Sequence, residues 1–263
     1  MGDMELGLKG KVALVTGGSD GIGFAAAYEM ALEGAEVIIC ARNQDNLDIA
    51  AQSIKESTGK EITTKSCDVT STEAVSKLFG EISQTFGGID ILVNNAGTSS
   101  AHPFLNADEN IWDYDIDLKL FGAIRCSQNA VPIMRSRGGG RIINVTTPGG
   151  KAPGPASVPT SVTRAAGIAL TKAMSKDFAS DNILVNTVCV GLIKSGQHRI
   201  RWENSDKKIS LDDFYSQMGE RVPMGRVGEA KEVGGLIAFL ASDRGSYITG
   251  ASINVDGGTS PVV

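Results

Sequence analysis

Seven short, mostly apolar runs recur along the whole chain, and they constrain its fold more than any other feature. They lie at residues 12–16, 35–40, 62–66, 89–93, 141–146, 183–189 and 252–255. Stretches with helical periodicity separate them, at roughly 22–33, 44–57, 72–86, 111–135, 163–179 and 230–241. Strands that are apolar along their whole length fit a parallel sheet with helices on both faces. The alternation therefore predicts an α/β chain with a doubly wound parallel sheet and right-handed crossovers.

Residues 195–222 depart from this alternation. The segment has no strand pattern and mixes basic with acidic side chains. Long irregular segments in compact domains usually serve as lids or binding loops. We therefore expect residues 1–263 to form a single domain that carries a substrate lid at about 195–222. The basic side chains could meet an anionic substrate, but the acidic ones among them favour a solvated lid.

The charge and the apolar content exclude several classes of partner. With 25 Lys and Arg against 30 Asp and Glu, the formal net charge is −5. The chain therefore lacks the excess of basic residues that binds a nucleic-acid backbone. No apolar stretch approaches the ~20 residues of a membrane span. The first residues also lack the basic and apolar regions of a secretion signal. We expect a soluble, cytoplasmic protein that acts on a small molecule, with neither nucleic acid nor a membrane as partner.

The cysteines and histidines are too scattered to predict metal chemistry. The four cysteines form no pair at a recognised metal-binding spacing, and the chain has only two histidines, His102 and His198. Free thiols in a reduced compartment are the simpler interpretation, and no metal site is predicted.

A glycine-rich turn, Thr16-Gly17-Gly18-Ser19-Asp20-Gly21-Ile22-Gly23, connects the first strand to the first helix. Its glycines allow a tight turn, close approach of the backbone to a pyrophosphate, and close packing of the helix on the strand. The free N–H groups and the positive dipole end of the helix would face the phosphates. In this context the glycines favour a dinucleotide site in a Rossmann fold over an ordinary turn. The predicted cofactor residues here are Gly17, Ser19, Asp20, Gly21, Ile22 and Gly23.

The residues after the second and third strands indicate which dinucleotide is bound. A site selective for NAD carries an acidic side chain after the second strand, where it bonds the ribose hydroxyls. This chain has Cys40-Ala41-Arg42 there, with a guanidinium suited to a 2′-phosphate. We therefore predict NADP(H) in preference to NAD(H), with Arg42 on the phosphate and Asp68 and Val69 beside the adenine. The alternatives are a solvated arginine and an ordinary aspartate at a strand end.

Further motifs give the chain a resemblance to a known family. The fourth strand leads into Asn94-Asn95-Ala96-Gly97, and the C-terminal part carries Val222-Pro223-Met224-Gly225-Arg226, Tyr247-Ile248-Thr249-Gly250 and Asp256-Gly257-Gly258. With the glycine-rich turn, these motifs make the chain similar to the short-chain dehydrogenase/reductase family over essentially its whole length. The resemblance implies a seven-stranded sheet and a homodimer or homotetramer built on the helices near 111–135 and 163–179. It also implies cofactor contacts from Asn95, Ala96, Gly97, Arg164, Gly191, Ile193 and Ser195.

The same resemblance points to a substituted catalytic tetrad. Where the family carries Asn, Ser, Tyr and Lys, this chain has Asp117, Thr147, Thr160 and Arg164. The four tyrosines, at positions 28, 114, 215 and 247, lie elsewhere and cannot replace the family's proton donor. A threonine hydroxyl is a much weaker acid than a phenol, so Thr160 is a poor substitute by itself. Arg164 stays charged and cannot relay protons, although its guanidinium could still bind the nicotinamide ribose. Thr147 keeps a hydroxyl and could still orient a carbonyl.

Two hypotheses concern this rebuilt site. Asp117 and Arg164 would form an ion pair in place of the family's Asn beside Lys; the alternative is that both residues drifted independently in an inactive site. His102, in the loop after the fourth strand, is the best replacement acid, because imidazole titrates near neutral pH, and Asp117 acting through a water is the other candidate. A single histidine in a loop nevertheless more often lies at the surface or packs against its neighbours than acts in catalysis.

Three functions remain open at this point. The first is an NADP(H)-dependent oxidoreductase with an atypical proton-transfer site and an unknown substrate. The second is a non-reducing reaction on the same scaffold, such as that of a lyase, a hydratase or an eliminating enzyme. The third is a catalytically inactive NADP(H)-binding sensor or partner subunit. An intact phosphate-binding turn favours the first, because the turn has no obvious use without a dinucleotide.

Overall fold

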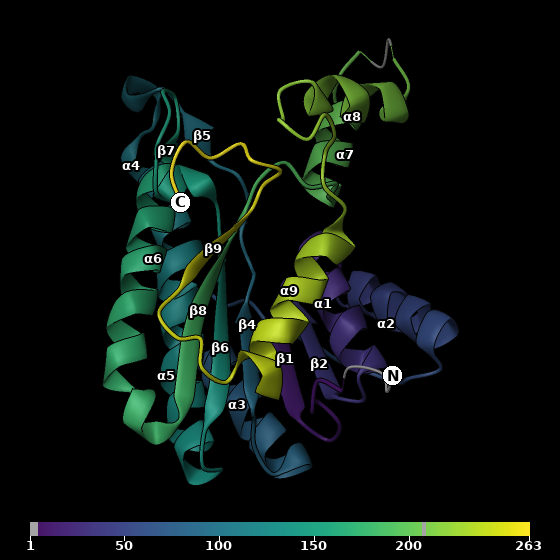
Figure 1. The fold of residues 1–263 in the computed structure, drawn as a ribbon, viewed down its shortest axis with the longest axis vertical. Coiled ribbons are helices and arrows are strands. Elements are labelled where there is room, and N and C mark those ends of the chain that lie inside the picture. The colour runs from purple at the N-terminus through teal and green to yellow at the C-terminus, as the bar shows by residue number, and fades with distance from the viewer. Residues whose placement is uncertain (1–4, 207–208) are drawn as a thin grey trace.

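The seven predicted strands are all present and form one parallel sheet (Figure 1). The computed structural model describes residues 5–206 and 209–263. The sheet runs in the order β3-β2-β1-β4-β6-β8-β9, and the strand order reverses between β1 and β4, beside the glycine-rich turn. In open α/β sheets ligands bind at such a reversal, outside the carboxyl ends of the strands. The strands are β1 Val12–Thr16, β2 Glu36–Ala41, β3 Thr63–Ser66, β4 Ile91–Asn94, β6 Gly140–Thr146, β8 Ile183–Val190 and β9 Ser252–Val255.

Helices cover both faces of this sheet, as predicted. On one face α1 Gly21–Leu32, α2 Gln44–Thr58 and α9 Ala230–Ala241 pack with the strands in one apolar cluster. On the other face α3 Thr72–Phe86, α5 Gly122–Ser136 and α6 Thr160–Asp177 pack in a second cluster. All of β1 and nearly all of β8 are buried, which is why these strands are apolar along their length.

Local sequence accounts for where several helices begin and end. The Asn43 side chain caps α2 and the Ser71 side chain caps α3, each by accepting a backbone N–H of the first turn. Gly59 and Gly87 end the same helices in the left-handed conformation, which glycine adopts without strain.

Three features were not predicted. First, β5 Ala101–His102 and β7 Val158–Pro159 form a small antiparallel sheet. Second, the helix expected over 111–135 is divided into α4 Glu109–Ile116, a π-helical turn Asp117–Phe121, and α5. Third, the segment expected to be irregular contains α7 Gly196–Glu203 and α8 Leu211–Gly219, while its positions 207 and 208 lie outside the described residues.

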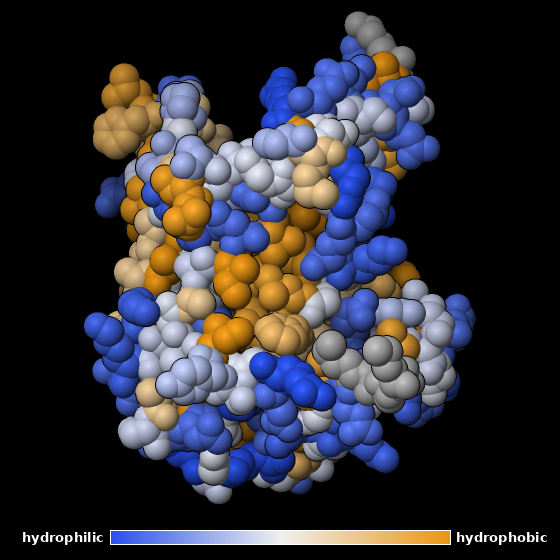
Figure 2. Space-filling model, viewed as in Figure 1, coloured by the Kyte–Doolittle hydropathy of each residue, from blue (hydrophilic) through white to orange (hydrophobic). Residues whose placement is uncertain are grey.

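These additions stand above the carboxyl ends of the strands. Figure 1 shows α7 and α8 rising on one side and α4, β5 and β7 on the other. Figure 2 shows that the surface is hollowed between the two raised parts. Within residues 5–206 and 209–263, no helix combines the length and the apolar character needed to cross a membrane.

Candidate active site

The turn after β1 is held against the sheet by the loop that follows β4. The Asn95 side-chain amide donates to the carbonyl oxygens of Thr16 and Gly17, at 3.0 Å each. Gly17 has a φ of +64°, and a Cβ there would lie 3.0 Å from the Asn95 amide nitrogen. At Gly23 a Cβ would overlap the carbonyl oxygen of Gly17. Both positions therefore require glycine, and the turn leads into the N-terminus of α1, where an anion binds favourably.

Two adjoining clefts open beside this turn. The larger, of about 450 Å³, lies between the turn, the loop after β4 and the segment after β8. The smaller, of about 160 Å³, lies at the ends of β2 and β3. Ser19 and Gly23 belong to the turn without lining either cleft. The predicted cofactor residues that line the larger cleft are Gly17, Asp20, Gly21, Ile22, Asn95, Ala96, Gly97, Arg164, Gly191, Ile193 and Ser195, and those that line the smaller are Arg42, Asp68 and Val69.

The smaller cleft has a cation available for an anionic ligand. Arg42 is exposed, and its guanidinium makes no hydrogen bond or ion pair with any described residue. Asp68 also lines this cleft, but its carboxylate accepts hydrogen bonds from the N–H and the hydroxyl of Thr70, at 3.0 and 2.8 Å. The positive charge of Arg42 is therefore free to meet a phosphate.

Thr147, Thr160 and Arg164, three of the predicted catalytic residues, come together in the larger cleft. Thr147 follows β6, and Thr160 and Arg164 lie one turn apart at the start of α6. Arg164 Nη1 donates to the carbonyl oxygen of Val145 at 2.7 Å, and its buried Nε has no hydrogen-bond partner among the described residues. Burial lowers the pKa of this guanidinium, although Asp115 acts in the opposite direction. The Nε–H of Arg164 is therefore a buried donor without an acceptor among the described residues, while Arg164 as a whole lines the larger cleft.

The predicted ion pair between Asp117 and Arg164 is wrong. Asp117 Oδ1 instead accepts from Arg125 Nη2 at 2.5 Å. In a helix, residues two apart point about 200° away from each other, whereas residues four apart share a face. The face of this helix that reaches Arg164 carries Asp115 and Lys119, so Asp117 is directed away from the site.

Lys119 was not among the predicted residues, yet it bonds Thr160 and lies beside Arg164. Its side chain is 1% exposed, and its ammonium donates to Asp115 Oδ1 and, at 2.8 Å, to Thr160 Oγ1. Asp115 also accepts the hydroxyl of Thr163 at 2.7 Å. The sequence does hold a signal for this pair, because an aspartate and a lysine four residues apart share one helix face.

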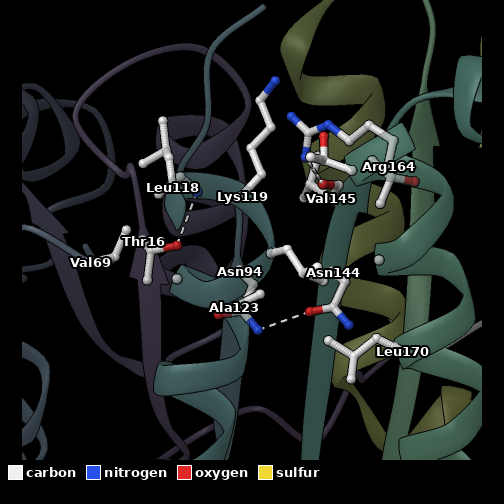
Figure 3. A pocket seen from close by; sticks show the side chains of 16 residues that line it. Thr16, Val69, Asn94, Leu118, Lys119, Ala123, Asn144, Val145, Arg164 and Leu170 are labelled. Carbon is white, nitrogen blue, oxygen red and sulfur yellow. Dashed lines mark hydrogen bonds between the residues drawn. The ribbon is translucent and has the colours of Figure 1, made fainter. Parts of the chain in front are cut away.

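The surroundings of Lys119 alter its acidity. Burial and the neighbouring Arg164 lower the pKa of Lys119 to about 8. Asp115 acts in the opposite direction and raises this pKa, but by less. Figure 3 shows both cationic side chains at the top of a small pocket, above the hydrogen-bonded amides of Asn94 and Asn144. Gly97 lets them approach the loop after β4, because a Cβ there would lie 3.0 Å from Arg164 Nη2 and 3.5 Å from Lys119 Cγ.

The two histidines lie in different surroundings. His102 is in β5, opposite Val158 of β7, and is not among the residues that line either cleft. His198, on α7, does line the larger cleft, and burial together with Arg201 lowers its pKa. The structure therefore brings a histidine to the cleft from the segment after β8 rather than from the loop after β4.

The segment after β8 also contacts the turn and the loop that frame the larger cleft. The Gln197 side chain accepts the N–H of Ser99 at 3.1 Å and donates to the carbonyl oxygen of Gly97 at 3.3 Å. Arg199 Nη2 lies 3.3 Å from Asp20 Oδ2, and both side chains are half exposed. These contacts hold α7 across the open side of the cleft.

The fold and the glycine-rich clefts define a class, the Rossmann-type proteins that hold a dinucleotide at the carboxyl edge of a parallel sheet. A family model described as Enoyl-(Acyl carrier protein) reductase matches residues 17–260. The chain is also 36% identical over 256 residues to "Dehydrogenase/reductase SDR family member 4" of Homo sapiens, covering 96% of this chain and 88% of that protein.

Solved structures agree with this class. L-sorbose reductase from Gluconobacter frateurii, complexed with NADPH and L-sorbose, is 33% identical with a TM-score of 0.92, over 99% of this chain and 100% of that one. An NADPH-bound short chain oxidoreductase from Pseudomonas aeruginosa PAO1, described as containing an atypical catalytic center, is 33% identical with a TM-score of 0.91, over 98% and 99%. The chain belongs to the short-chain dehydrogenase/reductase family, whose members are oxidoreductases.

Proposed function

We propose that this chain is an NADP(H)-dependent oxidoreductase that reduces a small carbonyl compound through an atypical proton-transfer site. The observation that carries the proposal is the free guanidinium of Arg42, which lies beside the glycine-rich turn where no carboxylate ends β2. A 2′-phosphate would be attracted to it, whereas the ribose hydroxyls of NAD would find no acidic partner there. The two similar structures described above were both solved with NADPH.

The residues of the two clefts fit such a dinucleotide along its length. The turn at Gly17 and Gly23 leaves room for a pyrophosphate at the N-terminus of α1, and Arg42 can bind the 2′-phosphate. Asp68 would border the adenine, and the Arg164 guanidinium, which lines the larger cleft, could bind an oxygen at the nicotinamide end. When bound, the reduced cofactor supplies a hydride; the chain must orient the substrate and supply a proton.

We further propose that Thr147, Thr160 and Arg164 take the places of the family's Ser, Tyr and Lys. Lys119, rather than Asp117, takes the place of the Asn, because it is the side chain of this helix that bonds Thr160. Thr147 lines the larger cleft and could orient a carbonyl oxygen through its hydroxyl.

The size of the larger cleft limits the size of the substrate. We propose that residues 1–263 act as a single domain in which the segment 195–222 serves as the lid. A volume of about 450 Å³, shared with the cofactor, suits a small molecule. His198 and Ile200 face this space from the lid and would contact the substrate.

Assembly and location are part of the same proposal. Tyr114, Phe121 and Val162, on α4, the π-helical turn and α6, are each nearly half exposed, which supports a homodimer or homotetramer built on these helices. The four cysteines are buried free thiols, which supports work in the reducing cytoplasm.

Calorimetry with NADPH and NADH tests the cofactor proposal. We expect NADPH to bind more tightly, and Arg42→Ala to weaken NADPH about 10- to 100-fold, the range for one or two charge-assisted hydrogen bonds. The same variant should leave NADH within about threefold, because NADH lacks the 2′-phosphate. Arg135→Ala, which removes an exposed arginine that bonds Asp181 away from the clefts, is the matched control. Absence of binding by both dinucleotides would overturn the proposal, and equal affinities would overturn the preference.

A further inference from the structure

We propose that Lys119 and Thr160 form a proton relay, in which the Thr160 hydroxyl protonates the substrate oxygen while Lys119 replaces the proton on Thr160. This inference rests on the proposed function, because the relay acts only where a carbonyl is reduced, or an alcohol oxidised, in the larger cleft.

The hydrogen bonds of Thr160 leave its own proton available. Thr160 Oγ1 accepts from Lys119 Nζ at 2.8 Å and from the backbone N–H of Ser100 at 2.9 Å. A hydroxyl has two acceptor lone pairs and one donor, so both lone pairs are in use. The O–H has no acceptor within the described part of the chain, and Thr160 lines the larger cleft. The hydroxyl proton is therefore free to bond a ligand there.

Lys119 supplies what a threonine lacks. A threonine hydroxyl is too weak an acid to give up its proton at neutral pH unless another acid replaces that proton in the same step. The Lys119 ammonium already donates to the same oxygen, so a proton can pass to Oγ1 as the hydroxyl proton leaves. Thr160 then never carries a negative charge.

The groups around Lys119 prepare it to release a proton. Asp115, on α4, holds the ammonium and is itself held by Thr163; Arg164, on α6, opposes the positive charge. The loop after β4 contributes Gly97, which carries no charge. Burial and Arg164 together lower the pKa of Lys119 to about 8, which suits an acid that acts near neutral pH.

The proposed step balances atoms and electrons. In reduction, the carbonyl carbon gains a hydride with its two electrons from the reduced dinucleotide, and the carbonyl oxygen gains the Thr160 proton. Thr160 Oγ1 gains a proton from Lys119 Nζ, and the neutral lysine regains one from solvent in the larger cleft by the reverse transfer through Thr160 Oγ1. Reduction requires the ammonium form, so its rate should fall as pH rises through about 8, and oxidation should rise over the same interval.

The first experiment needs no turnover. The Cε signal of Lys119, in protein labelled with ¹³C-lysine, is assigned by its loss in the double variant Asp115→Asn/Lys119→Met, which removes both charges of the buried ion pair. Titration should give a midpoint near 8 in the wild type. Thr160→Val removes the oxygen that accepts from the ammonium and should lower the midpoint, whereas Thr160→Ser keeps it. A midpoint at the ordinary value of ~10.4, or no shift in Thr160→Val, would overturn the relay.

The second experiment measures NADPH-dependent reduction of L-sorbose, ethyl acetoacetate and 2,3-butanedione. Thr160→Val and the double variant should lower kcat about 10²- to 10⁴-fold, the usual share of a positioned acid, and Thr160→Ser should recover most of it. The double variant should also lose the decline above pH 8. Lys172→Met, which removes an exposed lysine of α6 that bonds Gly250, is the control and should retain the wild-type rate.

The outcomes separate the relay from the proposed function. Normal NADPH binding with an unchanged kcat in Thr160→Val or in the double variant would overturn the relay alone. Normal binding by a wild type that reduces none of the three probes would also count against the relay. Failure of the wild type to bind NADPH would overturn the proposed function itself.

Discussion

Burial of the charged Lys119 side chain carries a large desolvation penalty. Removing an ammonium from water costs several kcal/mol, and a single carboxylate offsets this only with good geometry and further hydrogen bonds. Asp115 and Thr160 provide these bonds, yet Arg164 adds repulsion from α6. A methionine would fill the same space without the charge. Groups held at such a cost are concentrated at functional sites, which agrees with a chemical use for Lys119.

The charge on Lys119 should appear in the pH dependence of stability. The folded pKa, about 8, lies below the ordinary value of ~10.4, so between these limits the unfolded chain binds a proton that the folded chain has released. The free energy of unfolding should therefore rise across that interval, by up to about 3 kcal/mol at ~1.4 kcal/mol per pKa unit. Urea unfolding at intervals from about pH 7 to about 10.5 measures it. Asp115→Asn/Lys119→Met is the reference, and parallel curves for the two proteins would contradict the burial of a charged lysine.

At the scale of elements, the sequence predicts strands and helices correctly where apolar residues recur in a regular pattern. The seven strands were found because burial on both faces leaves continuous apolar runs. The glycine-rich turn was found because backbone contacts at Gly17 and Gly23 admit no other residue. By contrast α7, a short polar helix with no buried residues, offers no periodic apolar face to detect.

The division of the helix over 109–136 could not be predicted in the same way. At its centre the Gly122 N–H bonds the carbonyl oxygen of Asp117, five residues back, which makes a π-helical turn. Such turns insert one residue, re-aim the neighbouring side chains and are frequent at functional sites, but they leave no periodic signal. Lys119 lies inside this turn and Asp117 at its start, so the geometry of the turn bears on which of the two side chains is directed toward Arg164.

The contacts of α7 lead to a prediction about the lid. Gln197→Ala removes two hydrogen bonds to the loop after β4, which together contribute about 1 kcal/mol or more. Amide hydrogen exchange in α7 should become at least about fivefold faster, while exchange in α9 stays unchanged. Arg199→Ala should have a smaller effect, because its ion pair with Asp20 is half exposed and weakened by solvent. A larger effect from Arg199→Ala would show that the ion pair, not the amide, holds α7 in place.

At the scale of the whole molecule, the helices of one sheet face carry apolar side chains that bear on the proposed assembly. The face with α4 and α6 exposes Tyr114, Phe121 and Val162, each by 47 or 48%. The Arg125 guanidinium lies 5.6 Å from the centroid of the Phe121 ring, a weak attraction that favours this orientation of the ring. An aromatic side chain with a favoured orientation loses less entropy on association, which supports the proposed homo-oligomer.

Light scattering on the purified protein should therefore report a dimer or tetramer, and Phe121→Asp should shift it toward monomer. Placing a charge at the centre of an apolar interface raises the dissociation constant by at least about tenfold. Ile49→Asp is the matched control, because Ile49 is 68% exposed on α2, on the opposite face of the sheet. A wild type that stays monomeric at every concentration, or an equal effect from Ile49→Asp, would refute this assembly. NADPH binding should survive in the Phe121→Asp monomer, because Phe121 is not among the residues that line either cleft.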